Sequence, residues 1–318
     1  MDNFFDYLFE DFYSHLEAST RIAFAGDWHM NLERVDKVLD RVERMGADVV
    51  LHVGDFGYFP ALEDYDAFIS RVTARAKLHN YFIVFIEGNH EQYTNSRYPR
   101  WQSETVLTRD GLNTLRNKAD ENGFVLVSPR VLWATRGATA RIGTAGGKRG
   151  VSFIGCGGAG SINREFEQMR RFWSPDERVT ADDVAAVKRG TERLDGIVDI
   201  MLTHDAPSGA PVPKSRIKGS LDKVQAHVLK EAEETRKNIA EAVSVAKPSV
   251  LFHGHWHVRN NGINVPIDTN SGRTVIPSVQ SLGDELRAGD NLCFTDTHLW
   301  DCDADELNKR LIQGDLWV

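Results

Sequence analysis

The chain of 318 residues has few cysteines and no long apolar run. Its three cysteines, Cys156, Cys293 and Cys302, form no CxxC pair, which argues against a disulfide framework and against a thiolate zinc site. No stretch of 18 apolar residues occurs, so the sequence predicts no transmembrane helix and no membrane partner. The first 20 residues are acidic and have no basic region before an apolar run, so we expect no secretory signal. Together these absences favour a cytoplasmic protein with reduced thiols.

An excess of basic residues is also absent. The net charge is −8, which weighs against a sequence-independent nucleic-acid binder, because such a protein displaces counterions with Lys and Arg. This charge still permits a nucleotide ligand or a locally basic groove. The hydrophobic content of 41% and the charged content of 26% are typical of a folded globular protein, so disorder is not expected.

Apolar runs of strand length alternate with helix-patterned stretches in the first part of the chain. Runs at 22–25, 49–53 and 81–86 read as strands, and the stretches 32–45 and 61–78 between them read as helices. This order predicts a βαβαβ unit with a parallel sheet, and hence an α/β fold.

The remainder of the chain has shorter predicted elements. We expect strands at 124–127, 131–135, 151–154, 198–203, 249–253, 274–278 and 292–300, and helices at 181–193 and 221–245, the latter exposed. The Gly- and Arg-rich link 136–150 reads as a mobile hairpin, and a lid over an anionic substrate is the alternative. Residues 1–20 are expected to form an amphipathic helix that packs on the body, with partner binding as the alternative, and 21–318 to form a single domain.

Five polar clusters follow directly on apolar runs. They are Gly26-Asp27-Trp28-His29, Gly54-Asp55, Gly88-Asn89-His90-Glu91, Thr203-His204-Asp205 and Gly254-His255-Trp256-His257. Ligands of α/β sheets bind at the carboxyl ends of the strands, so the clusters predict one convergent site. Asp, Asn and His without Cys suit divalent ions such as Mn²⁺, Fe²⁺ or Zn²⁺. Seven candidate ligands exceed the needs of one tetrahedral ion and fit a pair of ions with a carboxylate between them.

In this order, the five motifs D-x-H, GD, GNHE, a lone His after a strand, and GHxH resemble those of the calcineurin-like metallophosphoesterase family. The resemblance spans about 21–258 and implies a four-layer αββα sandwich of two mixed β-sheets flanked by helices. It also implies a first metal on Asp27, His29 and His257, a second on Asn89, His204 and His255, and Asp55 as the bridge. Many relatives read GDxHG, whereas Met30 stands here in place of that glycine, which weakens any inference about substrate.

The resemblance further implies a mechanism. Two divalent ions, with Mn²⁺ favoured and Fe or Zn as alternatives, lower the pKa of a bridging water, so that hydroxide is available near neutral pH. His90 matches the family histidine that donates a proton or binds phosphate, and as imidazolium it would protonate the departing alkoxide. Asn89 and His90 would contact substrate. Arg97 has the spacing of a phosphate-gripping arginine in Ser/Thr phosphoprotein phosphatases.

Several neighbouring residues have two interpretations each. Asp205 would orient a ligand or cap the following turn. Trp28 and Trp256 would pack, or else line the pocket for a substrate ring. His52 and His253 read as buried, hydrogen-bonded residues behind the ligands, with support of the metal ligands as the alternative.

The predicted activity is hydrolysis of a phosphomonoester or phosphodiester, with a small phosphorylated molecule or nucleotide favoured as substrate. A Ser/Thr phosphoprotein phosphatase is an alternative, but the segment after Gly54-Asp55 lacks the arginine of the GDxxDRG motif. A nuclease of the same fold is less favoured because no basic, aromatic-interleaved tract occurs. A non-enzymatic binding scaffold is least favoured, because Asn89 and His90 are both present. The sequence leaves the oligomeric state open.

Overall fold

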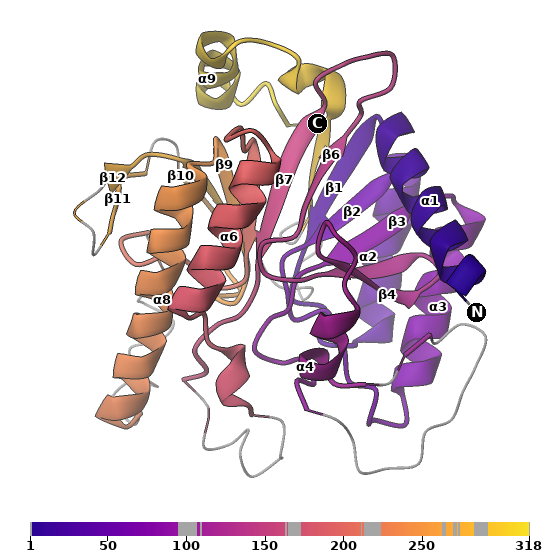
Figure 1. Cartoon of the computed structure of the whole chain (residues 1–318), viewed down its shortest axis with the longest axis horizontal. Helices are drawn as coiled ribbons and strands as arrows, with labels where there is room; N and C mark the ends of the chain where they lie inside the picture. The colour runs from indigo at the N-terminus through magenta and orange to yellow at the C-terminus, as the bar shows by residue number, and fades with distance from the viewer. Residues whose placement is uncertain are drawn as a thin grey trace.

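Two six-stranded sheets lie face to face, with helices on their outer sides (Figure 1). The computed structural model describes residues 2–94, 107–108, 110–162, 164, 173–210, 212, 224–262, 265–269, 272, 274–282 and 292–317. The four-layer αββα sandwich of two mixed sheets expected from the resemblance is therefore confirmed.

Each sheet has four central parallel strands and one antiparallel strand at each edge. The first sheet has the order β14 (Leu292–Asp296), β1 (Arg21–Ala25), β2 (Val49–His52), β3 (Phe82–Phe85), β5 (Val131–Ala134) and β4 (Phe124–Ser128). The second has the order β10 (Asn260–Gly262), β13 (Ser278–Ser281), β9 (Val250–His253), β8 (Ile200–Thr203), β7 (Val151–Cys156) and β6 (Thr139–Ile142). A separate ladder joins β11 (Ile267–Asp268) to β12 (Thr274–Val275).

Three apolar clusters fill the three spaces between the four layers. Between the sheets, Phe24 of β1 and Phe252 of β9 stack with ring centroids 3.9 Å apart. The outer face of the first sheet packs on α2 (Leu32–Arg44) and α3 (Tyr65–Leu78), and that of the second packs on α6 (Ala181–Arg193) and α8 (Ala226–Ala246). The central strands are buried on both faces, which explains their uninterrupted apolar sequences.

The boundaries of these helices follow from local chemistry. The Asn31 side chain caps α2 by accepting a hydrogen bond from the Arg34 backbone N–H. A capping box of Thr180 and Asp183 begins α6. Helix α2 buries Val35, Val38, Leu39 and Val42, the i, i+3, i+4, i+7 spacing of an amphipathic helix.

Two terminal helices cover edges of the space between the sheets. In α1 (Asp2–Ala18), Leu8, Phe12 and Leu16 are buried against that core, and the Phe12 ring lies 5.3 Å from the Phe82 ring. The helix α9 (Ala304–Gln313) adds Leu307 and Leu311 to the same core. The division into 1–20 and 21–318 stays a prediction. Among the described residues, no helix is long and apolar enough to cross a membrane.

Some sequence predictions are wrong in detail. The link 136–150 belongs to a hairpin as predicted, but it also contains a strand that was not predicted, β6, which pairs antiparallel with β7. The helix predicted from 221 is described from Ala226 and buries one face, including Ile239 and Val243. The predicted strand 274–278 is divided between β12 and β13, and the last strand ends at Asp296, where a 3-10 turn, η3 (Thr297–Trp300), follows. Helix α9 was not predicted. The remaining short helices are α4 (Leu112–Leu115), η1 (Arg116–Lys118) and η2 (Pro175–Glu177).

Candidate metal centre

The predicted ligands lie together where the carboxyl ends of strands from both sheets meet. The first sheet contributes Asp27 and His29 after β1, Asp55 after β2, and Asn89 and His90 after β3. The second contributes His204 after β8, and His255 and His257 after β9. The centre therefore needs both sheets, and residues 230 positions apart in the chain meet there.

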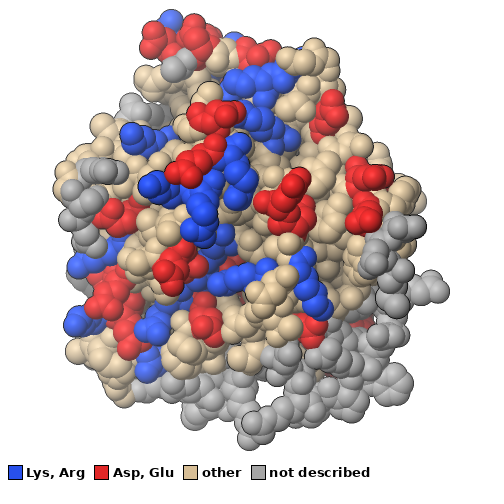
Figure 2. Space-filling model, in the orientation of Figure 1, with Lys and Arg blue, Asp and Glu red and all other residues tan. Residues whose placement is uncertain are grey.

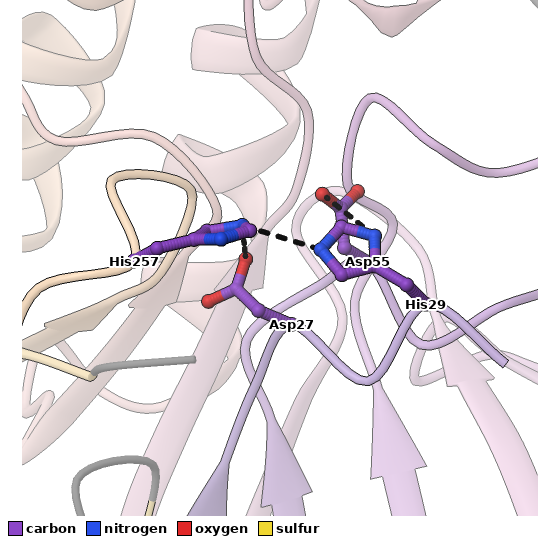
Figure 3. A group of neighbouring side chains, drawn as sticks. All are labelled: Asp27, His29, Asp55 and His257. Atoms are coloured by element: carbon purple, nitrogen blue, oxygen red, sulfur yellow. Dashed lines mark hydrogen bonds and ion pairs between the residues drawn. The ribbon is translucent and has the colours of Figure 1, made fainter. Parts of the chain in front are cut away.

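The first group of potential ligands consists of Asp27, His29, Asp55 and His257, whose ligand atoms all lie within 4.8 Å of one another. Figure 3 shows the His29 and His257 rings turned toward each other, with their Nε2 atoms 3.2 Å apart. Asp27 Oδ1 lies 3.5 Å from His257 Nε2, and Asp55 Oδ2 lies 3.7 Å from His29 Nδ1. Imidazole nitrogens and carboxylate oxygens that converge in this way are typical ligands of a divalent ion.

The second group consists of Asp55, His204 and His255, again within 4.8 Å, so that Asp55 belongs to both groups. Asp55 Oδ2 lies 3.3 Å from His204 Nε2. The amide oxygen of Asn89 lies 3.1 Å from the same nitrogen and completes the group. A carboxylate shared between two groups is the arrangement that a pair of metal ions requires.

The ring orientation of His204 is fixed by a hydrogen bond on the side away from the ligand group. Its Nδ1 lies 2.8 Å from the Val53 carbonyl oxygen, so Nδ1 carries the proton and donates it there. The other nitrogen then faces two oxygens, Asn89 Oδ1 and Asp55 Oδ2. A metal ion satisfies these three atoms together, whereas a neutral imidazole with a bare Nε2 does not.

Two glycines in the motifs are explained by the carboxylates. A Cβ atom on Gly88 would lie 2.1 Å from Asp55 Oδ1, and one on Gly254 would lie 2.4 Å from Asp27 Oδ2. The same carboxylates accept backbone hydrogen bonds at these turns: Asp55 from the His90 N–H at 2.9 Å, and Asp27 from the His255 N–H at 3.0 Å. The motifs GNHE and GHxH thus need glycine at Gly88 and Gly254, because a carboxylate occupies the space that a side chain at these positions would fill.

Strained backbone is concentrated at this centre. Five of the seven predicted ligands have left-handed backbone: Asp27, His29, Asp55, His255 and His257, with φ of 55°, 48°, 53°, 67° and 53°. This conformation is costly for residues with a Cβ, and it gathers where a site dictates side-chain direction. Met30 has φ 60°, which explains why a glycine suits this position in relatives. Its side chain packs against the cluster between the first sheet and its helices.

The electrostatics of the centre favour cation binding. Burial lowers the pKa of His255 well below its ordinary value, so that imidazole stays neutral and able to ligate a metal. Burial opposes ionisation of Asp55, but the adjacent His204, His90 and His29 outweigh it and hold the Asp55 pKa well below its usual range. Burial likewise opposes a charged His204, yet Asp55 raises the His204 pKa to about 10. The pocket thus binds a proton tightly where a metal ion would lie, and the donor set fits two divalent ions.

The comparisons with known proteins agree with this geometry. The model of the calcineurin-like phosphoesterase family matches residues 20–259, which include all five motifs. The chain belongs to this family. Comparison with curated proteins found no match.

Three solved structures resemble this chain at low sequence identity. A dimetal phosphatase from Danio rerio has 12% identity and a TM-score of 0.46, over 88% of this chain and 93% of that one. A calcineurin-like phosphoesterase from Bacillus subtilis has 12% identity and a TM-score of 0.35, over 87% and 85%. A Plasmodium protein described as the anchor in the inner membrane complex has 9% identity and a TM-score of 0.47, over 88% and 81%.

Residues next to the family motifs differ in their roles. Trp28 is fully buried and packs, whereas Trp256 is half-buried and donates its indole N–H to Asp205 at 2.8 Å. Asp205 also accepts the Ala206 backbone N–H at 2.7 Å, so it both holds the tryptophan of GHxH and caps the turn. His253 lies 3.1 Å from the Gly254 carbonyl as expected. The hydrogen bonding predicted for His52 is wrong: its ring contacts Trp28, and its nitrogens have no hydrogen-bond partner among the described residues.

The basic link does not form a lid. Arg136 is buried and donates to Glu87 Oε1 at 2.8 Å and to Asp183 Oδ2 at 2.7 Å. Arg149 pairs with Asp199, 2.8 Å away. These arginines tie elements of the fold together, whereas the tip of the hairpin, at 145–148, is exposed to solvent. Arg97, predicted to grip phosphate, lies outside the described residues.

No role was predicted from the sequence for the residues behind Asn89. The Asn89 amide donates to Ser161 Oγ at 3.0 Å, and Ser161 in turn donates its backbone N–H to Glu177 at 2.8 Å. Ser161 follows β7 in the manner of the other strand-end residues, and that position was the available signal. Glu177 has no such signal, because it lies on η2, far from any motif.

Proposed function

We propose that this protein is a metal-dependent phosphoesterase that hydrolyses a phosphomonoester or phosphodiester. The observation that carries the proposal is the pair of ligand groups sharing Asp55 at the meeting point of the two sheets. Membership of the calcineurin-like phosphoesterase family supports the same activity. Two bound divalent ions, for which we favour Mn²⁺, would supply a nucleophile from water at neutral pH and neutralise phosphate oxygens.

The protein residues have distinct parts in the proposed reaction. Asp27, His29 and His257 would hold one ion, Asn89, His204 and His255 would hold the other, and Asp55 would contact both. This division follows the two groups that the structure brings together. Asn89 would also contact the substrate.

His90 is the proposed proton donor for the leaving group. It is half-buried, its backbone N–H donates to Asp55, and its ring centroid lies 5.3 Å from that of His29. The side chain therefore lies beside the first ligand group without belonging to either group. Replacing His90 with Ala should lower the rate about 10²- to 10⁴-fold for alkyl phosphates, and much less for p-nitrophenyl phosphate, whose leaving group needs no proton. Equal losses for both substrates would contradict the assignment.

A small phosphorylated molecule or nucleotide is the favoured substrate, within a cytoplasmic setting suggested by the three free cysteines. On the face shown in Figure 2, a narrow band of basic side chains runs from the top to the middle with acidic side chains on both sides, and no broad basic surface is seen. That face offers no reason to prefer a nucleic acid.

The test compares chromogenic phosphomonoesters and bis-phosphodiesters with purified protein and Mn²⁺. We expect turnover of at least one class, and no measurable turnover by the Asp55→Asn variant. Asp182→Asn is the matched control, because Asp182 is exposed on α6, away from the centre. The proposal fails if no divalent ion supports hydrolysis of either class.

A further inference from the structure

The side-chain amide of Asn89 is held between the two sheets. Asn89 follows β3 of the first sheet, and Ser161 follows β7 of the second. The amide nitrogen donates to Ser161 Oγ at 3.0 Å, and the amide oxygen lies 3.1 Å from His204 Nε2. Asn89 and Ser161 are both buried, at 4% and 3% exposure, so water offers the amide little alternative. Ser161 is thus the hydrogen-bond partner on the side away from the ligand groups.

The two ends of this amide are not equivalent toward a cation. Its oxygen has lone pairs and can bind a metal ion, whereas its NH₂ group can only donate hydrogen bonds. The two ends have nearly the same shape, so packing alone does not select the orientation. A hydrogen-bond acceptor next to the NH₂ group does select the orientation of the amide. Ser161 Oγ is that acceptor.

Ser161 is itself fixed by Glu177, a carboxyl group that is 1% exposed. Glu177 Oε1 accepts the Ser161 backbone N–H at 2.8 Å, and the Ser161 hydroxyl also hydrogen-bonds to Glu177. A carboxylate only accepts, so the hydroxyl proton points to Glu177 and a hydroxyl lone pair is left for the Asn89 amide. Burial raises the pKa of Glu177 to about 8, while the hydrogen bonds from Ser161 favour the carboxylate. Measurements at pH 8.5 therefore suit the test.

We propose that Ser161, fixed by Glu177, is a positioning residue that turns the Asn89 amide oxygen toward the ligand group of His204 and His255. This inference rests on the proposed function for the statement that these residues hold a metal ion. Without Ser161, the amide rotates freely between two orientations, one of which directs NH₂ at the ion. Partners of this kind behind a ligand typically change metal affinity 10- to 100-fold.

The test measures binding of Mn²⁺ alone to metal-stripped protein by calorimetry at pH 8.5. Ser161→Ala should weaken the weaker of two binding steps by about 10- to 100-fold. Ser244→Ala is the matched control: Ser244 is 1% exposed, and its hydroxyl has no hydrogen-bond partner among the described residues. Glu177→Gln, which keeps the shape of the side chain, should weaken the same step in the same direction. If Ser161→Ala folds and its Mn²⁺ affinity is unchanged, the proposal is wrong. If Ser161→Ala does not fold, unchanged Mn²⁺ affinity in Glu177→Gln overturns the proposal instead.

A second background separates positioning from general damage. In Asn89→Asp the two carboxylate oxygens are equivalent, so either orientation presents an oxygen to the ion. Adding Ser161→Ala to this variant should change Mn²⁺ affinity less than about 3-fold, because no amide remains to orient. If the loss matches that seen with Asn89 present, Ser161 acts through folding and the proposal is wrong. Since binding is the readout, intact binding without hydrolysis would contradict the proposed function alone.

Discussion

Two of the buried charged clusters in the described part of this protein are completed in different ways. In the first, the guanidinium of Arg136 lies between Glu87 and Asp183, with N–O distances of 2.8 and 2.7 Å. In the second, Asp27 and Asp55 face imidazole rings, two of which, those of His29 and His255, burial holds in the neutral form. Buried carboxylates need a positive partner in both cases. In the structural cluster an arginine is that partner, whereas in the other cluster it is the proton on His204 or, as proposed, the metal ions that would replace it.

Backbone conformation separates the clusters as well. Left-handed residues recur through the metal centre, whereas Glu87, Arg136 and Asp183 are not among the residues with positive φ. An arginine is long enough to reach its carboxylates from ordinary backbone. A metal ion is a point that several short side chains must reach at once, so the backbone is distorted to direct them.

The largest stability effect is expected from the arginine cluster. Arg136→Met should lower the free energy of unfolding by about 3–5 kcal/mol, because Glu87 and Asp183 both stay buried and lose this partner, and Arg116, 3.6 Å from Glu87, is a more distant cation. Chemical denaturation measures this change. The double variant Glu87→Gln/Arg136→Met should be more stable than Arg136→Met, since Asp183, which still accepts two hydrogen bonds from Thr180, is then the one carboxylate of the cluster that lacks its arginine. A double variant that is no more stable would contradict the account of this cluster.

In the metal centre, the free energy of unfolding should instead depend on bound metal ions. Saturating Mn²⁺, at about 100 times each dissociation constant, should stabilise the folded protein by about 2.7 kcal/mol for each ion bound, because ions bind the folded state. A thermal shift with and without chelator measures this effect. Asp55→Asn should lose most of the shift, whereas Arg136→Met, if it folds, should keep it. Equal Mn²⁺-dependent thermal shifts in wild type and Asp55→Asn would contradict the proposed difference between the two clusters.

The smallest effect concerns the strained backbone at Met30. Met30→Gly should be more stable than Met30→Ala by about 1 kcal/mol, because both lose the same packing and only glycine relieves the left-handed conformation. At Ala185, exposed within helix α6, the order should be reversed, with glycine less stable than alanine by about 1 kcal/mol. If alanine is the more stable residue at both positions, Met30 carries no strain of the kind inferred.

The metal centre was more accessible to sequence reasoning than the arginine cluster, for a physical reason. Ligands at strand ends must follow apolar runs directly, so Asp55 and His204 have local context that a sequence reveals. Arg136 reads as part of a flexible basic link, because its partners Glu87 and Asp183 are 49 and 47 residues away. The same limit applies to Glu177, whose contact with Ser161 arises only through tertiary packing.

The βαβ units were predictable because α2 and the buried strands have strong periodic patterns. Strand β6 was not, since its sequence TARI is short and lies among glycines. Pairing with β7 determines the conformation of β6, and the local sequence of β6 contains no information about that contact.

The central claim is that two ions, sharing Asp55, are needed for phosphate-ester hydrolysis. The most direct test is a titration of Mn²⁺ into metal-stripped protein, at a protein concentration above the dissociation constants, with the hydrolysis rate and the bound metal followed together. The account predicts that the rate reaches its plateau at two equivalents per chain and stays at background in Asp55→Asn. A plateau at one equivalent, or bound metal without hydrolysis of any phosphate ester, would contradict it.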